Sequence, residues 1–235
     1  GSEMCIRDRD NRATDAWFDN LEEVRATVDN PTFFEEMQSS YREAGYELLG
    51  YADQGFRVMS TNKKIEHFQD FKGQKVRTME NSYHIQFFKA LGANPTPMNF
   101  SEVYIGLQQN TIDAQENPYE VIASNRLYEQ QDYVINTNHL PHLISLIVSE
   151  EFYEQLSVKE QKILAEAQRL ACDYARKEAD LRISQRMKEI EDSGTKILEL
   201  SDDTWNEMKE AAMPVREEIQ KNVSEKIIES YAENS

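Results

Sequence analysis

Apolar residues along the chain recur at two spacings, one typical of helices and one typical of strands. A spacing of three and four residues predicts helices over residues 14–28, 32–44, 80–91, 99–108, 119–130, 157–192 and 201–228, the last interrupted at Pro214. Short β-prone runs predict strands at 46–51, 56–60, 75–77, 131–136, 143–149 and 195–200. Because strands alternate with helices throughout, the pattern indicates an α/β fold in which helices cover mixed sheets.

The stretch from Gly73 to Pro118 carries the most information: GQKVRTMENSYHIQFFKALGANPTPMNFSEVYIGLQQNTIDAQENP. It predicts a strand that ends near Arg77, followed directly by a helix that ends at Gly92. Its remaining signals are a breaker cluster at 94–97, the spacing of a helix capping box at Asn99 and Glu102, and an acidic-amide turn at 115–118. The stretch therefore predicts two helices set between short extended segments.

A very long helix is predicted towards the carboxyl end. Ser157 and Glu160 have the spacing of a capping box, and the helical pattern continues until Ser193 and Gly194. A helix of this length raises a coiled coil as an alternative. Its apolar positions do not keep a strict heptad over the whole length, which weakens the coiled-coil interpretation.

One arginine, Arg77, stands at a position suited to anion binding. Arg77 follows a strand and precedes a helix, so its guanidinium and the free N–H groups of that helix can converge on one anion. An arginine binds a carboxylate through two parallel hydrogen bonds, which fixes orientation as well as affinity. The alternative for Arg77 is a solvated or salt-bridged surface residue. Arg57, in the strand before it, could form an ion pair with a neighbouring Asp or Glu.

The composition is strongly acidic. The 235 residues include 26 Lys and Arg against 43 Asp and Glu, for a net charge of −17, and 39% of them are hydrophobic. This length suffices for one or two globular domains with a core. The negative charge argues against nucleic acid or an anionic membrane as the main partner, so an anionic ligand would need a local basic pocket. The sequence contains no long apolar run, and we expect no membrane insertion.

Motifs of enzyme chemistry are missing from the sequence. It has no glycine-rich phosphate loop, no GxSxG elbow, no HExxH and no Cys/His nucleophile pair, and we expect no enzymatic activity. Cys5 and Cys172 imply neither a disulfide framework nor a metal cluster. His139 and His142 flank a proline and have no third ligand at a recognisable spacing, so we expect no metal and no cofactor.

Four ordered segments resemble one known family: GFRVMSTNKKI, GQKVR, LGANPTPMNFSEVY and LQQNTIDAQENP. They look like the signature region of the extracytoplasmic solute-binding proteins of TRAP transporters, the DctP-like family. The resemblance extends from about Asn30 to the end of the chain. In IDAQENP, Ala114 stands where the family usually has glycine, which limits the backbone slightly without involving the contact residues.

The resemblance implies a fold like that of type II periplasmic binding proteins, with two lobes, mixed sheets flanked by helices, and a long helix that spans both lobes. The expected divisions are non-native sequence at 1–9, the remainder of the N-terminal lobe at 10–73, mainly the second lobe at 74–136, and a crossover segment, the long helix and C-terminal helices at 137–235. Residues 1–9, GSEMCIRDR, resemble translated sequencing-adapter read-through and lack the apolar core of a signal peptide. We therefore expect an N-terminally truncated chain whose N-terminal lobe is incomplete and whose signal peptide is lost.

By the same resemblance, the chain is expected to be a periplasmic receptor. It would close on an organic acid, such as a C4-dicarboxylate, sialic acid or another sugar acid, and deliver it to the membrane permease subunits of a TRAP transporter. Arg77 would hold the ligand carboxylate bidentately, with Arg57 as a second and more distant cation. Asn117 would donate its amide N–H to the same carboxylate, and the ring of Phe100 would cover the ligand. Glu80 would either accept ligand hydroxyls or cap the helix that follows it, and we favour the cap.

An acidic helical scaffold without a small-molecule ligand is the alternative function. A scaffold would explain the long helix and the charge, but it leaves the strand–arginine–helix unit without a role. The resemblance does not identify the organic acid, because the contacts that distinguish these acids come largely from the N-terminal lobe of such proteins.

Overall fold

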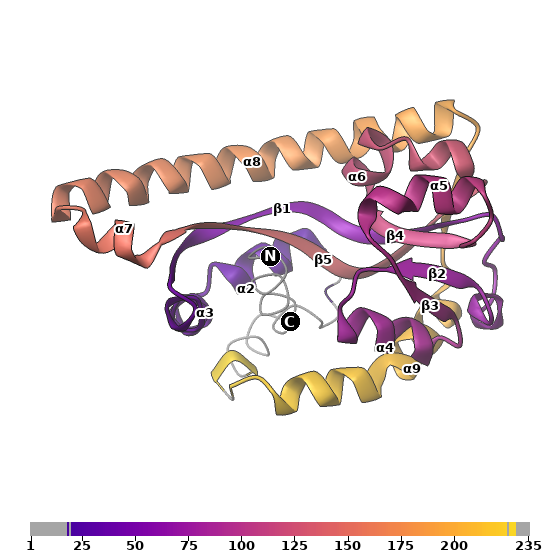
Figure 1. The fold of residues 1–235 in the computed structure, drawn as a ribbon, viewed down its shortest axis with the longest axis horizontal. Coiled ribbons are helices and arrows are strands. Elements are labelled where there is room, and N and C mark those ends of the chain that lie inside the picture. The colour runs from indigo at the N-terminus through magenta and orange to yellow at the C-terminus, as the bar shows by residue number, and fades with distance from the viewer. Residues whose placement is uncertain (1–17, 19, 225, 229–235) are drawn as a thin grey trace. The chain divides into compact units, whose positions relative to one another are not determined.

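The computed structural model describes residues 18, 20–224 and 226–228, so the expected non-native segment 1–9 and the start of the helix predicted at 14–28 lie outside the described residues. Figure 1 shows the fold. The helices are α2 (Leu21–Val28), α3 (Pro31–Glu43), α4 (Ser82–Ala90), α5 (Val103–Gln108), α6 (Tyr119–Ser124), α7 (Glu150–Gln155), α8 (Val158–Asp192) and α9 (Asp202–Lys221), with short 3-10 turns η1 (Phe68–Phe71), η2 (Phe100–Glu102) and η3 (Leu127–Gln130). The strands are β1 (Tyr46–Thr61), β2 (Lys75–Thr78), β3 (Asn94–Pro97), β4 (Ala114–Pro118), β5 (Tyr133–Ser149) and β6 (Lys196–Glu199).

The chain forms two compact units. Among the described residues, the first unit contains those up to Gly55, residues 141–181 and those from Gln220 onward, and the second unit contains residues 56–140 and 182–219. β1, β5 and α8 each contribute residues to both units. The lobes predicted from the sequence divided the chain at 73 and 136 instead. The predicted lobes were single continuous ranges of residues. The observed units are not, because the chain passes from one unit to the other within β1, β5 and α8.

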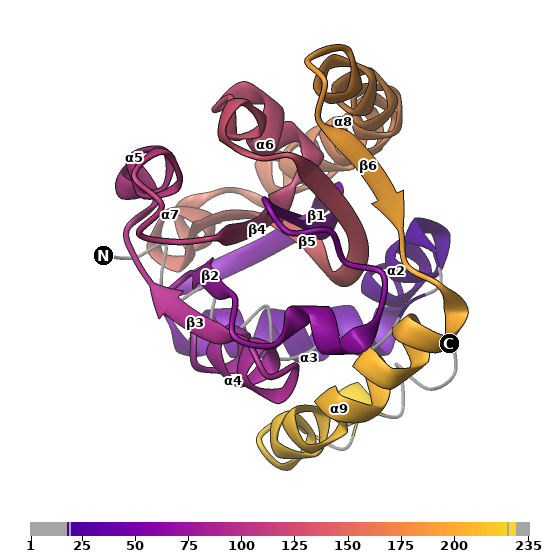
Figure 2. The same cartoon turned by 90° about the vertical axis from the view of Figure 1, so that its right-hand side faces the viewer.

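The strands belong to one mixed sheet in the order β3-β2-β4-β1-β5-β6. β1 pairs antiparallel with β4, β2 is parallel to both β3 and β4, and β5 is parallel to β6. In the second unit, α5 and α6 lie on one side of the strands and α4 lies on the other (Figure 1 and Figure 2). The predicted α/β fold class, with a mixed sheet and flanking helices, is confirmed.

Four segments that lie outside the predicted strands belong to strands. β1 runs unbroken through residues 53–55, which separate two predicted strands, and Gly55 takes a φ of 81° there. β5 likewise runs through residues 138–142, which separate two other predicted strands. β3 consists of the predicted breaker 94–97, because a proline is tolerated on the edge strand of a sheet, where a missing N–H interrupts no inner ladder. β4 includes the predicted turn 115–118, and all five residues of the strand are buried.

The helix boundaries confirm one of the two predicted capping boxes. The N–H of Ser157 donates to Oε2 of Glu160 at 2.8 Å, and the N–H of Glu160 donates to Oγ of Ser157 at 3.3 Å, at the start of the 35-residue α8. The box predicted at Asn99 is absent, since its side chain makes no capping bond. α9 continues through Pro214, where a second helix was expected, so the backbone hydrogen bond that a proline cannot donate does not end the helix there.

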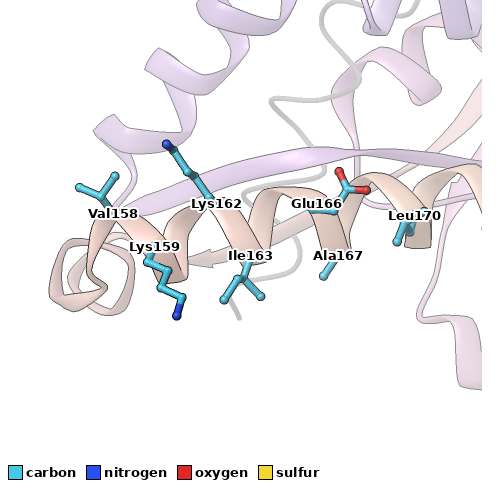
Figure 3. A pocket seen from close by; sticks show the side chains of 7 residues that line it. All are labelled: Val158, Lys159, Lys162, Ile163, Glu166, Ala167 and Leu170. Atoms are coloured by element: carbon cyan, nitrogen blue, oxygen red, sulfur yellow. The ribbon is translucent and has the colours of Figure 1, made fainter.

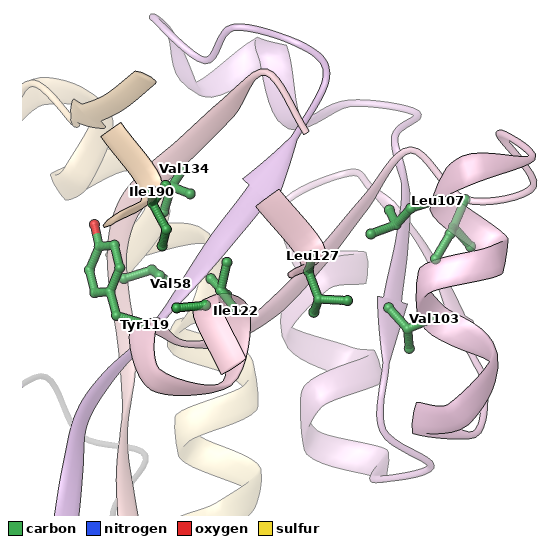
Figure 4. Packing of buried hydrophobic residues seen from close by; sticks show 10 residues of the cluster. Val58, Val103, Leu107, Tyr119, Ile122, Leu127, Val134 and Ile190 are labelled. Carbon is green, nitrogen blue, oxygen red and sulfur yellow. The ribbon is translucent and has the colours of Figure 1, made fainter. Parts of the chain in front are cut away.

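An apolar core holds the second unit together. Its buried side chains come from strands and helices alike: Val58, Val103, Leu107, Ile112, Tyr119, Ile122, Ala123, Leu127, Val134 and Ile190. Figure 4 shows Ile190, from the end of α8, in the same cluster as Val134 of β5 and Tyr119 of α6. Each fully buried Leu or Ile contributes about 1.5–3 kcal/mol. The core therefore fixes the strands that carry the candidate site.

In the first unit, α8 packs closely against β1. A Cβ at Gly50 would lie 1.8 Å from Nε2 of Gln168, so a side chain at this position would have to displace the amide of Gln168. Arg25 of α2 donates to both carboxylate oxygens of Asp53, at 2.8 and 3.1 Å, and to Asp180 at 2.8 Å. These hydrogen bonds connect α2, β1 and α8. Asp53 is buried, so the loss of Arg25 would leave a buried carboxylate without its counter-charge.

The opposite side of α8 is apolar but exposed. Its exposed apolar residues recur four, three, four and seven positions apart, which places them on one side of the helix: Ile163, Ala167, Leu170, Tyr174 and Leu181. We call these five residues the outer stripe of α8. Figure 3 shows three of them, Ile163, Ala167 and Leu170, lining a pocket on the helix surface. α8 therefore has a packed side and a separate apolar side that the described residues leave uncovered.

Candidate functional site

Arg77 lies on β2, just before α4. Its Nε and Nη2 donate hydrogen bonds of 3.0 and 2.8 Å to the carbonyl oxygen of Met98. Its guanidinium carbon lies 5.7 Å from the centre of the Phe100 ring, within the range of a cation–π contact. These contacts hold the guanidinium in one orientation and leave Nη1 without a hydrogen-bond partner among the described residues.

Arg77 is a buried cation. It is 3% exposed, and no carboxylate of the described residues forms an ion pair with it. Burial lowers the pKa of Arg77, the nearby charge of Glu116 opposes this, and the charge of Arg57 lowers the pKa further. The ordinary pKa of arginine is so high that the group stays charged. An uncompensated buried charge is costly, and an anionic ligand would relieve that cost.

Arg57 of β1 and Glu116 of β4 form a buried ion pair. Their side chains are 2% and 0% exposed. Nε of Arg57 donates to Oε2 of Glu116 at 2.5 Å, and Nη2 donates to Oε1 at 3.0 Å and to the carbonyl oxygen of Glu116 at 2.9 Å. The antiparallel register brings these strands together, with Met59 directly opposite Glu116. Arg57 is thus paired with an acid of the neighbouring strand, Glu116.

Two histidines complete the environment of the Glu116 carboxylate. Nδ1 of His84, from α4, lies 3.5 Å from Oε1, and Nε2 of His139, from β5, lies 3.2 Å from Oε2. Nδ1 of His139 lies 2.8 Å from the hydroxyl of Thr137, so a neutral ring can donate to Glu116 and accept from Thr137. The ring of His139 also stacks on Phe87, with 5.2 Å between the ring centres.

The cluster determines which groups are charged. Burial alone would raise the pKa of Glu116, but the charge of Arg57, the proximity of His84 and hydrogen bonds from His139 and His84 outweigh it and hold the pKa well below its ordinary value. Burial lowers the pKa of His139, and this outweighs the opposing effect of Glu116. Glu116 is therefore ionised and His139 neutral at neutral pH, so Arg57 and Glu116 cancel each other's charge.

Acidification is expected to destabilise the protein through His139. Its pKa is lower in the folded state than in the unfolded chain, so the unfolded chain binds more protons as the pH falls through about 6.5, and the free energy of unfolding decreases. Urea unfolding at several pH values between about 8 and 5 measures this slope. The His139→Gln variant should show a shallower decrease over that range. An equal slope in the variant would contradict the assignment.

A chain of hydrogen bonds fixes the orientation of Asn117. Nη2 of Arg57 donates to Oδ1 of Asn117 at 3.1 Å, and Nδ2 of Asn117 donates to Oε1 of Gln115 at 2.7 Å. Gln115 in turn donates to Ser60 at 2.8 Å, and Ser60 donates to Gln131 at 3.0 Å. Each amide in this chain has its oxygen and nitrogen assigned by its neighbours. One hydrogen of Nδ2 of Asn117 then remains for a further acceptor.

Of the other two predicted site residues, Phe100 contacts Arg77, whereas Glu80 is an exposed residue just before α4. Phe100 is 40% exposed and contacts Arg77 with its ring, which suits a residue that covers a ligand. Glu80 is exposed and does not cap α4. The cap is Asn81, whose Oδ1 accepts from the N–H groups of Tyr83 and His84. The predicted cap at Glu80 is therefore wrong. These N–H groups of α4, which we expected to bind the anion, are already used.

Sequence reasoning missed Glu116, His84 and His139 as members of the site. Glu116 directly precedes Asn117 in the segment QENP, which was predicted as a turn, so its burial was not foreseen. His139 was considered only as a metal ligand. The described residues contain no group of three or more His, Cys, Asp or Glu arranged to hold a metal ion. No local signal in the sequence reveals the pair, because the segment AQENP is polar and its burial becomes visible only in the structure.

The site therefore combines a buried cation, an oriented amide and an aromatic ring. These groups can bind a carboxylate, but they include no activated nucleophile and no acid–base pair aimed at an open position. None of the helices in the described part of the chain combines the length and apolar character needed to span a bilayer.

Comparison with known proteins gives one consistent result. A family model described as "Bacterial extracellular solute-binding protein, family 7" matches residues 17–222. The ectoine-binding periplasmic protein TeaA of Halomonas elongata is 33% identical over 181 residues, which cover 76% of this chain and 53% of that protein. The 2,3-diketo-L-gulonate-binding periplasmic protein YiaO of Escherichia coli is 34% identical over 159 residues, covering 66% of this chain and 48% of YiaO.

Solved structures agree with the family match. A TRAP periplasmic solute-binding protein of Haemophilus influenzae with bound L-gulonate superposes with a TM-score of 0.86 at 30% identity, covering 93% of this chain and 72% of that chain. The structure of TeaA gives a TM-score of 0.87 at 28% identity, covering 98% and 76%. The chain spans 59%, 52% and 53% of the length of three curated relatives, which is somewhat more than half.

Proposed function

The chain belongs to the bacterial extracellular solute-binding proteins of family 7, and from this premise we propose that it captures an organic acid for a TRAP transporter. In this role it binds the acid in the periplasm and delivers it to the membrane permease subunits. The names of its relatives support a carboxylate ligand, since they include a binder of 2,3-diketo-L-gulonate and a structure with bound L-gulonate. The family consists of solute-binding proteins, and we propose no enzymatic activity for this chain.

The observation that carries the proposal is Arg77. It is buried, held in one orientation by the Met98 carbonyl, and paired with no carboxylate of the described residues. We propose that its guanidinium binds the ligand carboxylate, with the remaining N–H of Asn117 as a second donor and the ring of Phe100 against the ligand. Arg57 then acts through Asn117, which it orients, rather than on the ligand itself.

Thermal unfolding with a panel of organic acids tests the proposed function. The panel contains sugar acids, C4-dicarboxylates and sialic acid, with the corresponding neutral sugars as matched controls. A ligand that binds only the native protein raises its melting temperature, and at a hundred times Kd it adds about 2.7 kcal/mol to the free energy of unfolding. We expect at least one acid, and none of the neutral sugars, to raise the melting temperature. A panel without effect would instead support the acidic scaffold.

A further inference from the structure

The outer stripe of α8 has the spacing of a surface that pairs with another helix. Together with two charged residues it forms a row of exposed positions that alternate in steps of three and four, which we call the α8 row: Glu160, Ile163, Ala167, Leu170, Tyr174, Lys177 and Leu181. Steps that average about 3.5 residues are the repeat of the seam along which two helices pair. The whole row lies in the first unit, and its large apolar side chains are between 54% and 67% exposed.

The α8 row is complementary in side-chain size to its own reversed order. In two antiparallel copies of α8 related by a two-fold axis midway between Ala167 and Leu170, residues at equal distances from that axis lie opposite each other. Ala167 of one copy then faces Leu170 of the other, and Ile163 faces Tyr174. At each of these positions a smaller side chain meets a larger one, which lets the facing layers interdigitate.

The same register brings together the two charges of the α8 row. Glu160 of one copy faces Lys177 of the other, at two places related by the symmetry. Oε2 of Glu160 accepts hydrogen bonds from Ser157, and the second carboxylate oxygen can accept from an ammonium group. A parallel pair would instead set Glu160 against Glu160 and Lys177 against Lys177, which is unfavourable. The charges therefore favour the antiparallel direction.

The charged residues beside the α8 row are compatible with this register. Lys159 lies next to Asp180 of the second copy, which is a pair of opposite charges. Glu166 lies next to Asp173 of the second copy, but both carboxylates already pair with Arg169 of their own helix, at 2.7 and 3.0 Å. The repulsion between them across the helix pair is therefore reduced.

We propose that the α8 row is the contact surface of a symmetric dimer, in which α8 pairs antiparallel with α8 of a second copy of this chain. The inference goes beyond the proposed function and involves no ligand. Contacts with β1, such as the hydrogen bond of 3.0 Å from Arg176 to the Tyr51 carbonyl, already hold α8 in place, so association orders little additional backbone. The net charge of −17 opposes association at long range, and salt at about 0.15 M limits that repulsion to about 8 Å.

Sedimentation velocity over a series of protein concentrations, at about 0.15 M salt, tests the dimer. We expect the mass of the wild type to rise with concentration towards twice the 27.4 kDa of one chain. Leu170→Glu should weaken the dimer at least about tenfold, because it places a charge in the middle of the apolar seam. Lys162→Glu is the matched control, since Lys162 is exposed on the same helix and points away from Ile163 (Figure 3), and it should leave the dimer intact. A wild type that stays monomeric at every concentration overturns the proposal, as does a dimer that Leu170→Glu leaves unchanged.

Two charge reversals, Glu160→Lys and Lys177→Glu, test the antiparallel register. Each variant alone sets like charges against each other at both symmetry-related places, so we expect its dimer to weaken at least about tenfold. In an equimolar mixture, a heterodimer of the two variants has opposite charges at both places, so the strength of the dimer should return towards that of the wild type. Both residues are exposed, and circular dichroism checks that each variant is folded. A mixture that associates no better than the separate variants overturns the antiparallel pairing.

Discussion

Replacing Arg77 with alanine is expected to abolish organic-acid binding, with a loss of at least about 3 kcal/mol, or roughly a hundredfold in Kd. The expected loss is large because Arg77 is 3% exposed and supplies the uncompensated charge of the site. Calorimetry with a ligand found by the thermal panel measures the effect. Arg126→Ala is the matched control, because Arg126 is exposed in the same unit and pairs only weakly with Glu129, at 3.7 Å. It should bind as the wild type does.

Arg77→Lys separates charge from geometry. In the wild type, Nε and Nη2 donate to the Met98 carbonyl, which leaves the far edge of the guanidinium for the ligand. An ammonium group cannot hold the carbonyl along one edge and a carboxylate along the other, so we expect most of the affinity to be lost with the charge retained. Wild-type affinity in the lysine or the alanine variant would refute the carboxylate clamp.

Replacing Glu116 with leucine is expected to destabilise the protein by about 3–5 kcal/mol. The change leaves Arg57 buried without its counter-charge and removes the acceptor of His139. Urea unfolding followed by circular dichroism measures the loss. The double variant Arg57→Met with Glu116→Leu removes both charges, and we expect it to recover a large part of the stability. A double variant as unstable as the single one would show that packing, and not charge, causes the loss.

The sequence predicted the residues whose role is local. Arg77 became a candidate because it lies between a predicted strand and a predicted helix, whereas Asn117 and Phe100, in the same continuous stretch, became candidates only through the family resemblance. The pairing of Arg57 with Glu116 spans 59 positions. Such a pair depends on which strands become neighbours, and no local pattern encodes that. Arg57 was therefore predicted as a second ligand cation, whereas the structure binds it to Glu116.

The misassigned turns have a common physical cause. Polar residues such as Gln115 and Asn117 are rare in buried strands, and their presence predicted a turn. In the structure they satisfy one another within the hydrogen-bond chain, so their burial carries no unpaired polar atom. The helix cap shifted from Glu80 to Asn81 for a similarly local reason. Asn is among the residues preferred at a helix N-cap and Glu is not, so propensity by itself favoured Asn81.

Two opposing forces act between molecules of this chain: repulsion from the net charge and attraction between the apolar outer stripes of α8. In dilute buffer, a net charge of −17 makes the molecules repel one another at long range. Added salt shortens that repulsion to about 10 Å at 0.1 M, while sulfate strengthens the attraction between apolar surfaces. The exposed Ile163, Leu170 and Tyr174 then face neighbouring molecules without an electrostatic barrier. The choice of salt during purification should therefore govern whether the chain stays dispersed, and low-sulfate buffers are the appropriate starting point.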